Sequence, residues 1–319
     1  AASGEFLYFA ADDGVNGMEL WKTDGTGAGT VMVGDLNPGS WGSNPTKGVD
    51  LGGLLIFVAW DPYSSEQIWV SDGTAVGTTI IKNIYPGYGS SPTWLSVLGD
   101  QVLFSAEDGT NGRELWKTDG TETGTVLVKD INPGMGYGSP AYLTVAGGVL
   151  YFAANDGVNG IELWKTDGTE AGTVLVADIR AGSTSSSPTG IKARGSDVFF
   201  AANDGVHGNE LWMSDGSGAG TVLVADISIG TSSSSPLWLM AMGDSVYFSA
   251  STAAEGSELW RSDGSMAGTT MVQDVNPGAS SSGPRPLAAS DSRLFFTAGT
   301  AAEGVEMWQT DGTGAGTAI

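Results

Sequence analysis

The sequence has 319 residues, and its 36 acidic against 13 basic side chains give a formal net charge of −23. A field of this sign repels phosphate backbones and anionic lipid, which argues against nucleic acid and membrane surfaces as partners. The absence of cysteine excludes disulfides, thiolate metal sites and cysteine nucleophiles. The 50 glycines favour short strands joined by turns over helices.

One motif, Glu-Leu-Trp-Lys-Thr-Asp-Gly-Thr at residues 19–26, recurs along the whole chain. Successive copies of its tryptophan are 48, 47, 48, 48, 48 and 48 residues apart. These tryptophans are Trp21, Trp69, Trp116, Trp164, Trp212, Trp260 and Trp308. So regular a period predicts one repeat domain over residues 1–319, built from seven repeats of about 48 residues.

The expected strands start with an apolar segment at residues 7–9, and the fourth repeat shows one full set. Residues 142–145, 149–152, 162–164 and 174–176 are typical of four short strands, which we label A, B, C and D. A Gly-Gly or Gly-Asp pair links A to B, and Asp-Gly-Thr-x-x-Gly-Thr forms a second tight turn between C and D. The longer D–A connection has the reach to begin the next sheet.

Strands B and D are almost continuously apolar instead of alternating with polar residues. Antiparallel sheets that hide both faces are expected where each sheet lies between two similar sheets. Radial stacking of seven such sheets predicts an all-β fold, a seven-bladed β-propeller of four-stranded antiparallel blades. The repeated tryptophan is then the wedge between neighbouring blades.

The two ends of the chain make the strand count uneven. The chain starts just before a B strand at residues 7–9 and stops inside a D strand at residues 318–319, so one A strand is missing beside Leu7. Three explanations stay open. The protein continues beyond Ile319, or the first blade has three strands, or a neighbouring molecule donates the missing strand.

The recurring pattern Glu-Leu-Trp-x-x-Asp-Gly-Thr-x-x-Gly-Thr resembles the signature of the bacterial ELWxxDGT repeat family, which occurs in large exported or surface proteins. The resemblance covers essentially the whole chain, with departures at residues 67–69, Ser217, Ser265 and residues 306–308. It implies an extracellular or cell-surface location in a bacterium and says little about activity.

The B–C loops carry many oxygen-bearing side chains, and the strand directions place these loops and the D–A connections at the same end of the sheets. Hard oxygen ligands on glycine-bent loops are what calcium prefers, and the negative charge favours the ion. The alternative is that Asp and Asn bond loop amides while Glu caps the strand start. The candidate calcium ligands are Asp12, Asp13, Asn16, Glu19, Glu107, Asp108, Asn111, Glu114, Asn155, Asp156, Asn159, Glu162, Asn203, Asp204 and Glu210.

Aromatic residues break the symmetry of the repeats at this same end. Lying over adjacent blades, they could stack on sugar rings or anchor a protein partner, and the alternative is that they cover blade edges. Trp94 and Trp238, on A strands, are expected to fill or line the central channel. The candidate partner-binding residues are Trp41, Trp60, Tyr63, Tyr85, Tyr88 and Tyr137.

Catalysis is not expected, because the only histidine, His207, stands where other repeats have Asn, and no nucleophile-elbow or phosphate-loop pattern occurs. The leading hypothesis is an exported, non-catalytic propeller that binds or scaffolds at the bacterial cell surface, with protein, glycan or copies of itself as partner. Two alternatives are a structural subunit of an extracellular filament or coat assembled by strand donation, and a calcium-dependent multivalent carbohydrate-binding lectin.

Overall fold

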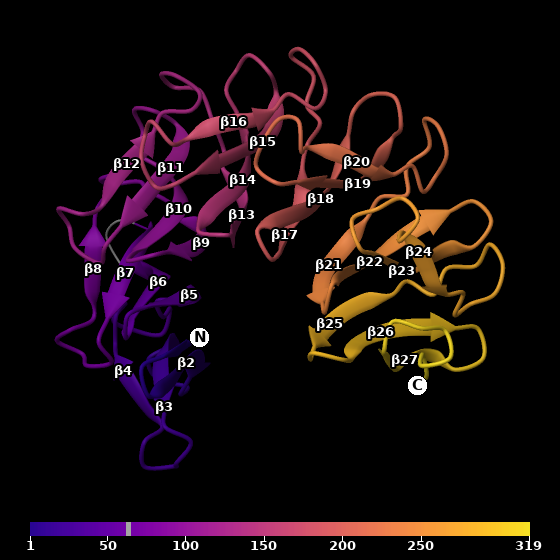
Figure 1. Cartoon of the computed structure of the whole chain (residues 1–319). Coiled ribbons are helices and arrows are strands. Elements are labelled where there is room, and N and C mark those ends of the chain that lie inside the picture. Colours follow the sequence, from indigo (N-terminus) through magenta and orange to yellow (C-terminus); the bar gives the residue numbers. More distant parts are fainter. Residues whose placement is uncertain (62–64) are drawn as a thin grey trace. The chain divides into compact units, whose positions relative to one another are not determined.

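The computed structural model describes residues 1–61 and 65–319, and these form 27 strands in seven antiparallel sheets (Figure 1). Each sheet contains the strands of one repeat in chain order, and we call each sheet a blade. The fold is a seven-bladed β-propeller of antiparallel blades, as the repeat predicts, with four strands in six blades and three in one. None of the described segments is a helix with the length and apolarity needed to span a membrane.

The first three blades consist of the following strands. Blade one contains β1 (Ala2–Ser3), β2 (Phe6–Asp12), β3 (Met18–Thr23) and β4 (Val31–Gly34). Blade two contains β5 (Thr46–Leu51), β6 (Leu54–Asp61), β7 (Ser65–Ser71) and β8 (Thr79–Lys82). Blade three contains β9 (Thr93–Leu98), β10 (Gln101–Glu107), β11 (Arg113–Thr118) and β12 (Val126–Lys129).

The remaining four blades follow the same order. Blade four contains β13 (Ala141–Ala146), β14 (Val149–Asn155), β15 (Ile161–Thr166) and β16 (Val174–Ala177). Blade five contains β17 (Thr189–Arg194), β18 (Asp197–Asn203), β19 (Asn209–Ser214) and β20 (Val222–Ala225). Blade six contains β21 (Leu237–Met242), β22 (Ser245–Thr252), β23 (Gly256–Ser262) and β24 (Thr270–Gln273). Blade seven contains β25 (Arg285–Ala289), β26 (Leu294–Thr300) and β27 (Gly304–Thr310).

Blade one differs from the others in its A strand, and blade seven differs in its D strand. The A strand that the sequence leaves out of blade one is present as the two-residue β1, which pairs with Phe6 and Leu7 of β2. In blade seven the D strand is reduced to a single bridge between Gln309 and Ala318, so its sheet has three strands. The five blades between them have all four strands.

The chain forms two compact units. Unit 1 consists of Ala1–Leu150, Ala154–Gly157 and Thr166–Thr173, and unit 2 of Tyr151–Ala153, Val158–Lys165 and Val174–Ile319. In unit 1 the A strands β5, β9 and β13 lie next to one another, and in unit 2 the A strands β17, β21 and β25 do the same. A single domain over residues 1–319 stays a prediction.

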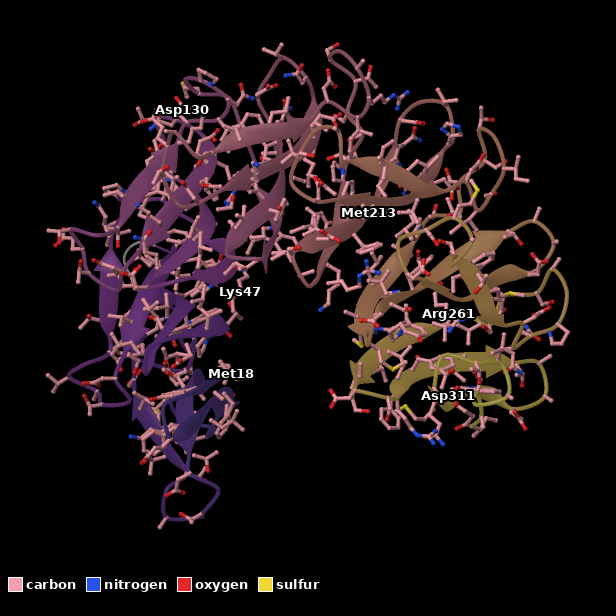
Figure 2. The ribbon with its side chains drawn as sticks, in the orientation of Figure 1. Met18, Lys47, Asp130, Met213, Arg261 and Asp311 are labelled. Carbon is pink, nitrogen blue, oxygen red and sulfur yellow. The ribbon has the colours of Figure 1, made fainter. Side chains whose placement is uncertain are left out.

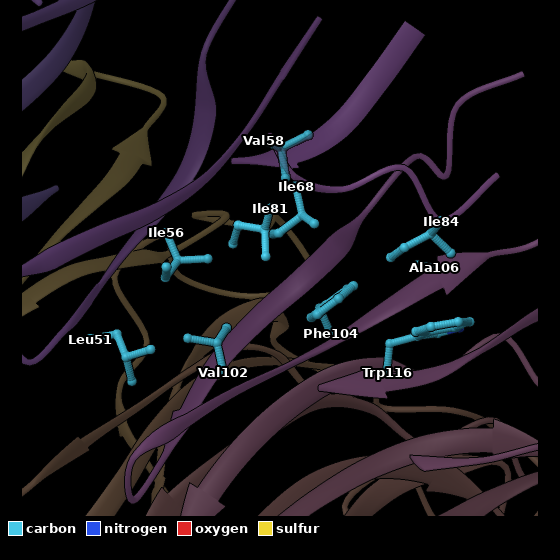
Figure 3. Packing of buried hydrophobic residues seen from close by; sticks show 10 residues of the cluster. All are labelled: Leu51, Ile56, Val58, Ile68, Ile81, Ile84, Val102, Phe104, Ala106 and Trp116. Carbon is cyan, nitrogen blue, oxygen red and sulfur yellow. The ribbon is translucent and has the colours of Figure 1, made fainter. Parts of the chain in front are cut away.

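The motif tryptophan packs against the preceding blade, as predicted. In unit 1, Trp116 of blade three is 8% exposed and shares a core with Ile56 and Ile68 of blade two (Figure 3). In unit 2, Trp308 of blade seven joins Tyr247 of blade six in the same way. A side chain of this kind buries on the order of 200 Å², which stabilises the fold by several kcal/mol at about 25 cal/mol/Å².

The Asp-Gly-Thr turn between the C and D strands is held by its own side chains. In blade one, Asp24 Oδ1 accepts hydrogen bonds from the Thr26 amide at 2.8 Å and from its hydroxyl at 2.7 Å. The Thr26 hydroxyl in turn accepts a bond from the Gly29 amide at 2.9 Å. A Cβ atom at Gly29 would overlap the Asp24 carboxylate, which explains why the motif requires a second glycine.

The substitution Gly29→Ala is expected to lower the free energy of unfolding by about 2 kcal/mol, because the methyl group must displace the Asp24 carboxylate. Gly27→Ala in the same turn is the matched control, since a Cβ atom there meets open space. The control is expected to be neutral or to stabilise by up to about 1 kcal/mol. Urea unfolding measures both variants, and equal losses would contradict the steric explanation.

Candidate functional site

The D–A connections and the B–C loops lie at the same end of the blades, as predicted. The Trp60 amide at the end of β6 donates to the Ser43 carbonyl at 2.7 Å, and the Glu107 amide at the end of β10 donates to the Ser90 carbonyl at 3.0 Å. Ser251 of blade six donates to the Ser234 carbonyl at 2.8 Å. These bonds fix each connection against the loop beside it, so side chains from both kinds of segment share one surface.

The glutamate of the repeated motif holds the D–A connection in place, and we call this arrangement the glutamate clamp. In blade six, Glu258 is fully buried, and its carboxylate accepts bonds from the Val275 amide at 3.0 Å, the Ser282 amide at 2.8 Å and the Ser282 hydroxyl at 2.6 Å. The same clamp joins Glu19 to Ser43, Glu114 to Gly138, Glu162 to Ser186 and Glu210 to Ser234.

An aspartate sixteen residues after each clamp glutamate accompanies it, and blade two replaces both acids by amides. There Gln67 Nε2 donates to Asn83 Oδ1 at 3.3 Å. In blade three the counterparts are Glu114 and Asp130, and Asp130 Oδ1 is buried without a hydrogen-bond partner (Figure 2 labels Asp130). Two carboxylates offer no donor between them unless one is protonated.

The electrostatics of the clamp follow from its burial. Burial raises the pKa of Glu114 to about 7, and the nearby Asp130 carboxylate adds to this against three backbone N–H donors that lower it. Burial also raises the pKa of Glu162, Glu210 and Glu258. Glu114 alone among these four has glycine in place of the serine that supplies a hydroxyl donor.

The predicted calcium ligands have internal hydrogen-bond partners. Asp13 Oδ1 accepts from the amides of Val15 and Asn16, both at 2.8 Å, and Asn16 Nδ2 donates to Asp13 Oδ2 at 2.8 Å. Aspartate therefore bonds loop amides in this loop. Side chains at the same loop positions bond equivalent groups: Asp12, Asp108, Asn111, Asn155, Asn203 and Asp204.

The remaining candidates are the four clamp glutamates and three other side chains of the same blade end. Glu19, Glu114, Glu162 and Glu210 are the clamp glutamates, which hold amides and hydroxyls of the connections. Glu107 accepts a bond from the Tyr137 hydroxyl, while Asp156 and Asn159 lie in the corresponding loop of blade four. Across residues 1–61 and 65–319, no three His, Asp or Glu side chains are grouped so that they could hold a metal ion. Calcium binding therefore stays a prediction.

The predicted aromatic residues lie on the surface of unit 1. Trp41 is 86% exposed and Tyr88 73% exposed, and Trp60 is exposed as well. The rings of Tyr85 and Tyr88 are 5.0 Å apart, and the Tyr137 hydroxyl donates to Glu107 at 3.1 Å. Tyr63 lies outside the described residues. The structure thus pairs Tyr85 with Tyr88 at the blade end where the sequence places them.

A β-bulge at the start of the A strands brings further side chains to this end. Thr46 pairs with Val58 and Val49 with Ile56, so β5 has one more residue than β6 across this step. β9, β17 and β21 have the same shift. In blades two to six the second residue of the A strand, which we call the bulge position, has a left-handed backbone with φ between 56° and 63°: Lys47, Trp94, Tyr142, Gly190 and Trp238.

Glycine suits the bulge position best, because a side chain in the left-handed region costs roughly 1–2 kcal/mol. Gly190 shows that the scaffold accepts it. Trp94 nevertheless keeps an indole there that is 44% exposed, with its ring 4.7 Å from that of Tyr142. In unit 2, Trp238 is 52% exposed, and the Arg285 guanidinium lies 4.4 Å from its ring. A strained backbone that carries an exposed aromatic ring is a candidate binding position.

A pocket lies beside Trp94, between β5 and β9. Its volume is about 500 Å³, and Lys47, Gly48, Val49, Thr93, Trp94 and Leu95 line it. Lys47, which extends from β5 (Figure 2), donates from Nζ to the Pro92 carbonyl at 3.1 Å. The pocket therefore combines an indole face, aliphatic walls and one ammonium group.

Sequence reasoning placed Trp94 and Trp238 on A strands but did not find Lys47 and Tyr142 as their companions. The alignment of the repeats contained the signal that could have found them. The five bulge residues follow the same Pro at the same distance, and the copy in blade five is glycine, the residue that a left-handed backbone favours.

Comparisons with known proteins agree on the fold. No family model and no curated protein matches the sequence, so membership of the ELWxxDGT family stays a prediction. The structure is similar to a prolyl endopeptidase (TM-score 0.59, 12% identity, covering 98% of this chain and 48% of that one). It is also similar to prolyl oligopeptidase B from Galerina marginata (0.57, 11%, 99% and 48%) and oligopeptidase B from Leishmania major (0.55, 10%, 98% and 46%).

The chain spans about half the length of these peptidases. The likeness corrects the functional hypothesis stated above. The structural neighbours are the propeller domains of peptidases, so the expectation of a surface scaffold, a filament subunit or a calcium-dependent lectin is wrong. The match does not point to catalysis by this domain itself.

Proposed function

We propose that this chain is a non-catalytic propeller domain that binds extended polypeptide along the neighbouring A strands β5, β9 and β13 and serves a separate catalytic domain. The observation that carries the proposal is Trp94, an exposed indole on a strained backbone beside a pocket. Aromatic side chains in such positions are frequent anchors for peptides.

The comparisons support a role with peptides. One similar structure concerns the role of inter-domain dynamics in catalysis and specificity of prolyl endopeptidases, and another holds a 35mer substrate. The non-catalytic part of the proposal is supported by the place of the single histidine and by the lack of cysteine. Its single histidine, His207, has Nδ1 2.7 Å from Asp204 Oδ2 within a B–C loop, and the chain has no cysteine.

Binding can be tested on an array of random decapeptides, with the affinities of the hits measured by calorimetry. Trp94→Gly is expected to weaken binding by about tenfold or more, because an aromatic anchor is lost. Its stability is expected to stay within about 1 kcal/mol of the wild type, since the released backbone strain offsets the lost ring contact with Tyr142. Thermal unfolding checks this second expectation.

Trp41→Ala is the matched control, because it removes an equally large ring from the D–A connection after blade one. This variant is expected to bind the same peptides with unchanged affinity. Loss of binding in Trp41→Ala but not in Trp94→Gly would move the site to the connections. An array without hits would overturn the proposed function.

A further inference from the structure

The residues around Trp94 indicate which part of a peptide binds there. We propose that the pocket between β5 and β9 receives the C-terminal residue of a peptide, with its apolar side chain against Trp94 and its α-carboxylate at Lys47. This inference rests on the proposed function and deepens it.

The pocket walls select an apolar side chain. Val49, Leu95 and the indole of Trp94 supply hydrophobic surface, and Gly48 contributes no side chain. The volume of about 500 Å³ lies within the range of roughly 300–1,000 Å³ that small-ligand pockets occupy. The left-handed backbone at Trp94 fixes the direction of its Cα–Cβ bond, so the position of the indole that lines the pocket is partly set before a ligand binds.

Lys47 supplies the attraction for a carboxylate. Its ammonium group has three N–H donors, and the bond to the Pro92 carbonyl uses one of them. Lys47 is exposed and lines the pocket, and its bond to the Pro92 carbonyl holds Nζ directly before Thr93 and Trp94, which line the same pocket. A charge-assisted bond to a carboxylate is stronger than one to a neutral carbonyl.

The negative charge of the protein favours a peptide with one carboxylate over a peptide with many. A net charge of −23 repels a peptide that carries many acidic side chains. A single carboxylate next to an apolar side chain avoids most of this repulsion, and the end of a peptide chain provides that combination. Capture of a C-terminal carboxylate is a recurrent form of peptide recognition.

The test compares two probes by calorimetry on the full chain: the acetylated peptide Gly-Gly-Leu with a free C-terminal carboxylate, and the same peptide with a C-terminal amide. The free acid is expected to bind about tenfold more tightly. Lys47→Gln should reduce the affinity for the acid to that for the amide and leave the amide unchanged. Lys82→Gln is the matched control, since Lys82 Nζ also donates to a backbone carbonyl, that of Thr125, but from an outer strand.

The outcomes separate this inference from the proposed function. Equal binding of acid and amide, or an unchanged preference in Lys47→Gln, would overturn the C-terminal assignment while peptide binding stands. Equally tight binding of an amidated peptide with an internal Asp beside Leu would also overturn it. If neither probe nor any array peptide binds, the proposed function itself fails.

Discussion

Replacing the clamp glutamate of blade six by alanine is expected to lower the free energy of unfolding by about 3–5 kcal/mol. Glu258→Ala leaves the Val275 amide, the Ser282 amide and the Ser282 hydroxyl without their acceptor, in a site that is fully buried. Each orphaned donor costs about 1–3 kcal/mol, and relief of the buried charge returns part of the sum. Urea unfolding followed by circular dichroism measures the loss.

Blade seven supplies the control for this prediction. Glu306 begins the same motif there but is exposed. Glu306→Ala is therefore expected to change stability by less than about 0.5 kcal/mol. Similar losses in the two variants would show that the glutamate acts through its strand and not through the connection it holds.

The stability of the protein is expected to fall as pH rises from about 4.5 to about 7, with Glu114 as a principal cause. The pKa of Glu114 is raised in the folded state, so the folded protein binds this proton more tightly than the unfolded chain does. The contribution is complete below the unfolded pKa and disappears as pH passes through the folded pKa. Thermal unfolding across this pH range measures the slope.

A double substitution that copies blade two tests the origin of the slope. Glu114→Gln with Asp130→Asn introduces the amide pair that Gln67 and Asn83 form naturally, and it should flatten the decline. The control, Glu122→Gln with Glu170→Gln, removes two exposed carboxylates and should leave the decline unchanged. A control that flattens the slope equally would assign it to general charge repulsion.

The turn aspartates act in the opposite direction at lower pH. Bonds from the following hydroxyl and amide lower the pKa of Asp24, Asp119 and Asp167 below 3.8. Stability from these groups is present above 3.8 and is lost as pH falls through their folded pKa values. From these groups alone, stability is expected to be highest between about pH 3.8 and 4.5.

The fold could be predicted well from the sequence because the same strand and turn signals occur in each of the seven repeats. Alternation, Gly-Gly pairs and the Asp-Gly-Thr turn are signals over a few residues, and the structure confirms the strands, the hairpins and the tryptophan wedge. Because the period is fixed, a repeat that departs from the motif, such as the one with Gln67, can still be aligned with the others. The short β1 could not be predicted, because two residues carry no periodicity.

The site was harder to predict because its causes are not local. The clamp joins Glu258 to Ser282 across 24 residues, a separation that no spacing rule connects. Glutamate on a polar loop therefore resembled a metal ligand. At the bulge position, the left-handed backbone of Trp94 results from the pairing of β9 with β10. Tryptophan normally avoids this backbone region, so its presence in the sequence gives no sign of it.

The bulge position has one more consequence. Lysine, tryptophan, tyrosine and glycine all occupy it in blades two to six on an almost identical φ, so the strand pairing imposes the same backbone on these four residue types. These residues can thus be exchanged without a change in strand pairing, while their side chains contact residues of the neighbouring A strand, as the rings of Trp94 and Tyr142 do at 4.7 Å. New ligand preferences could arise in one repeat while the shape of every other repeat stays as it was.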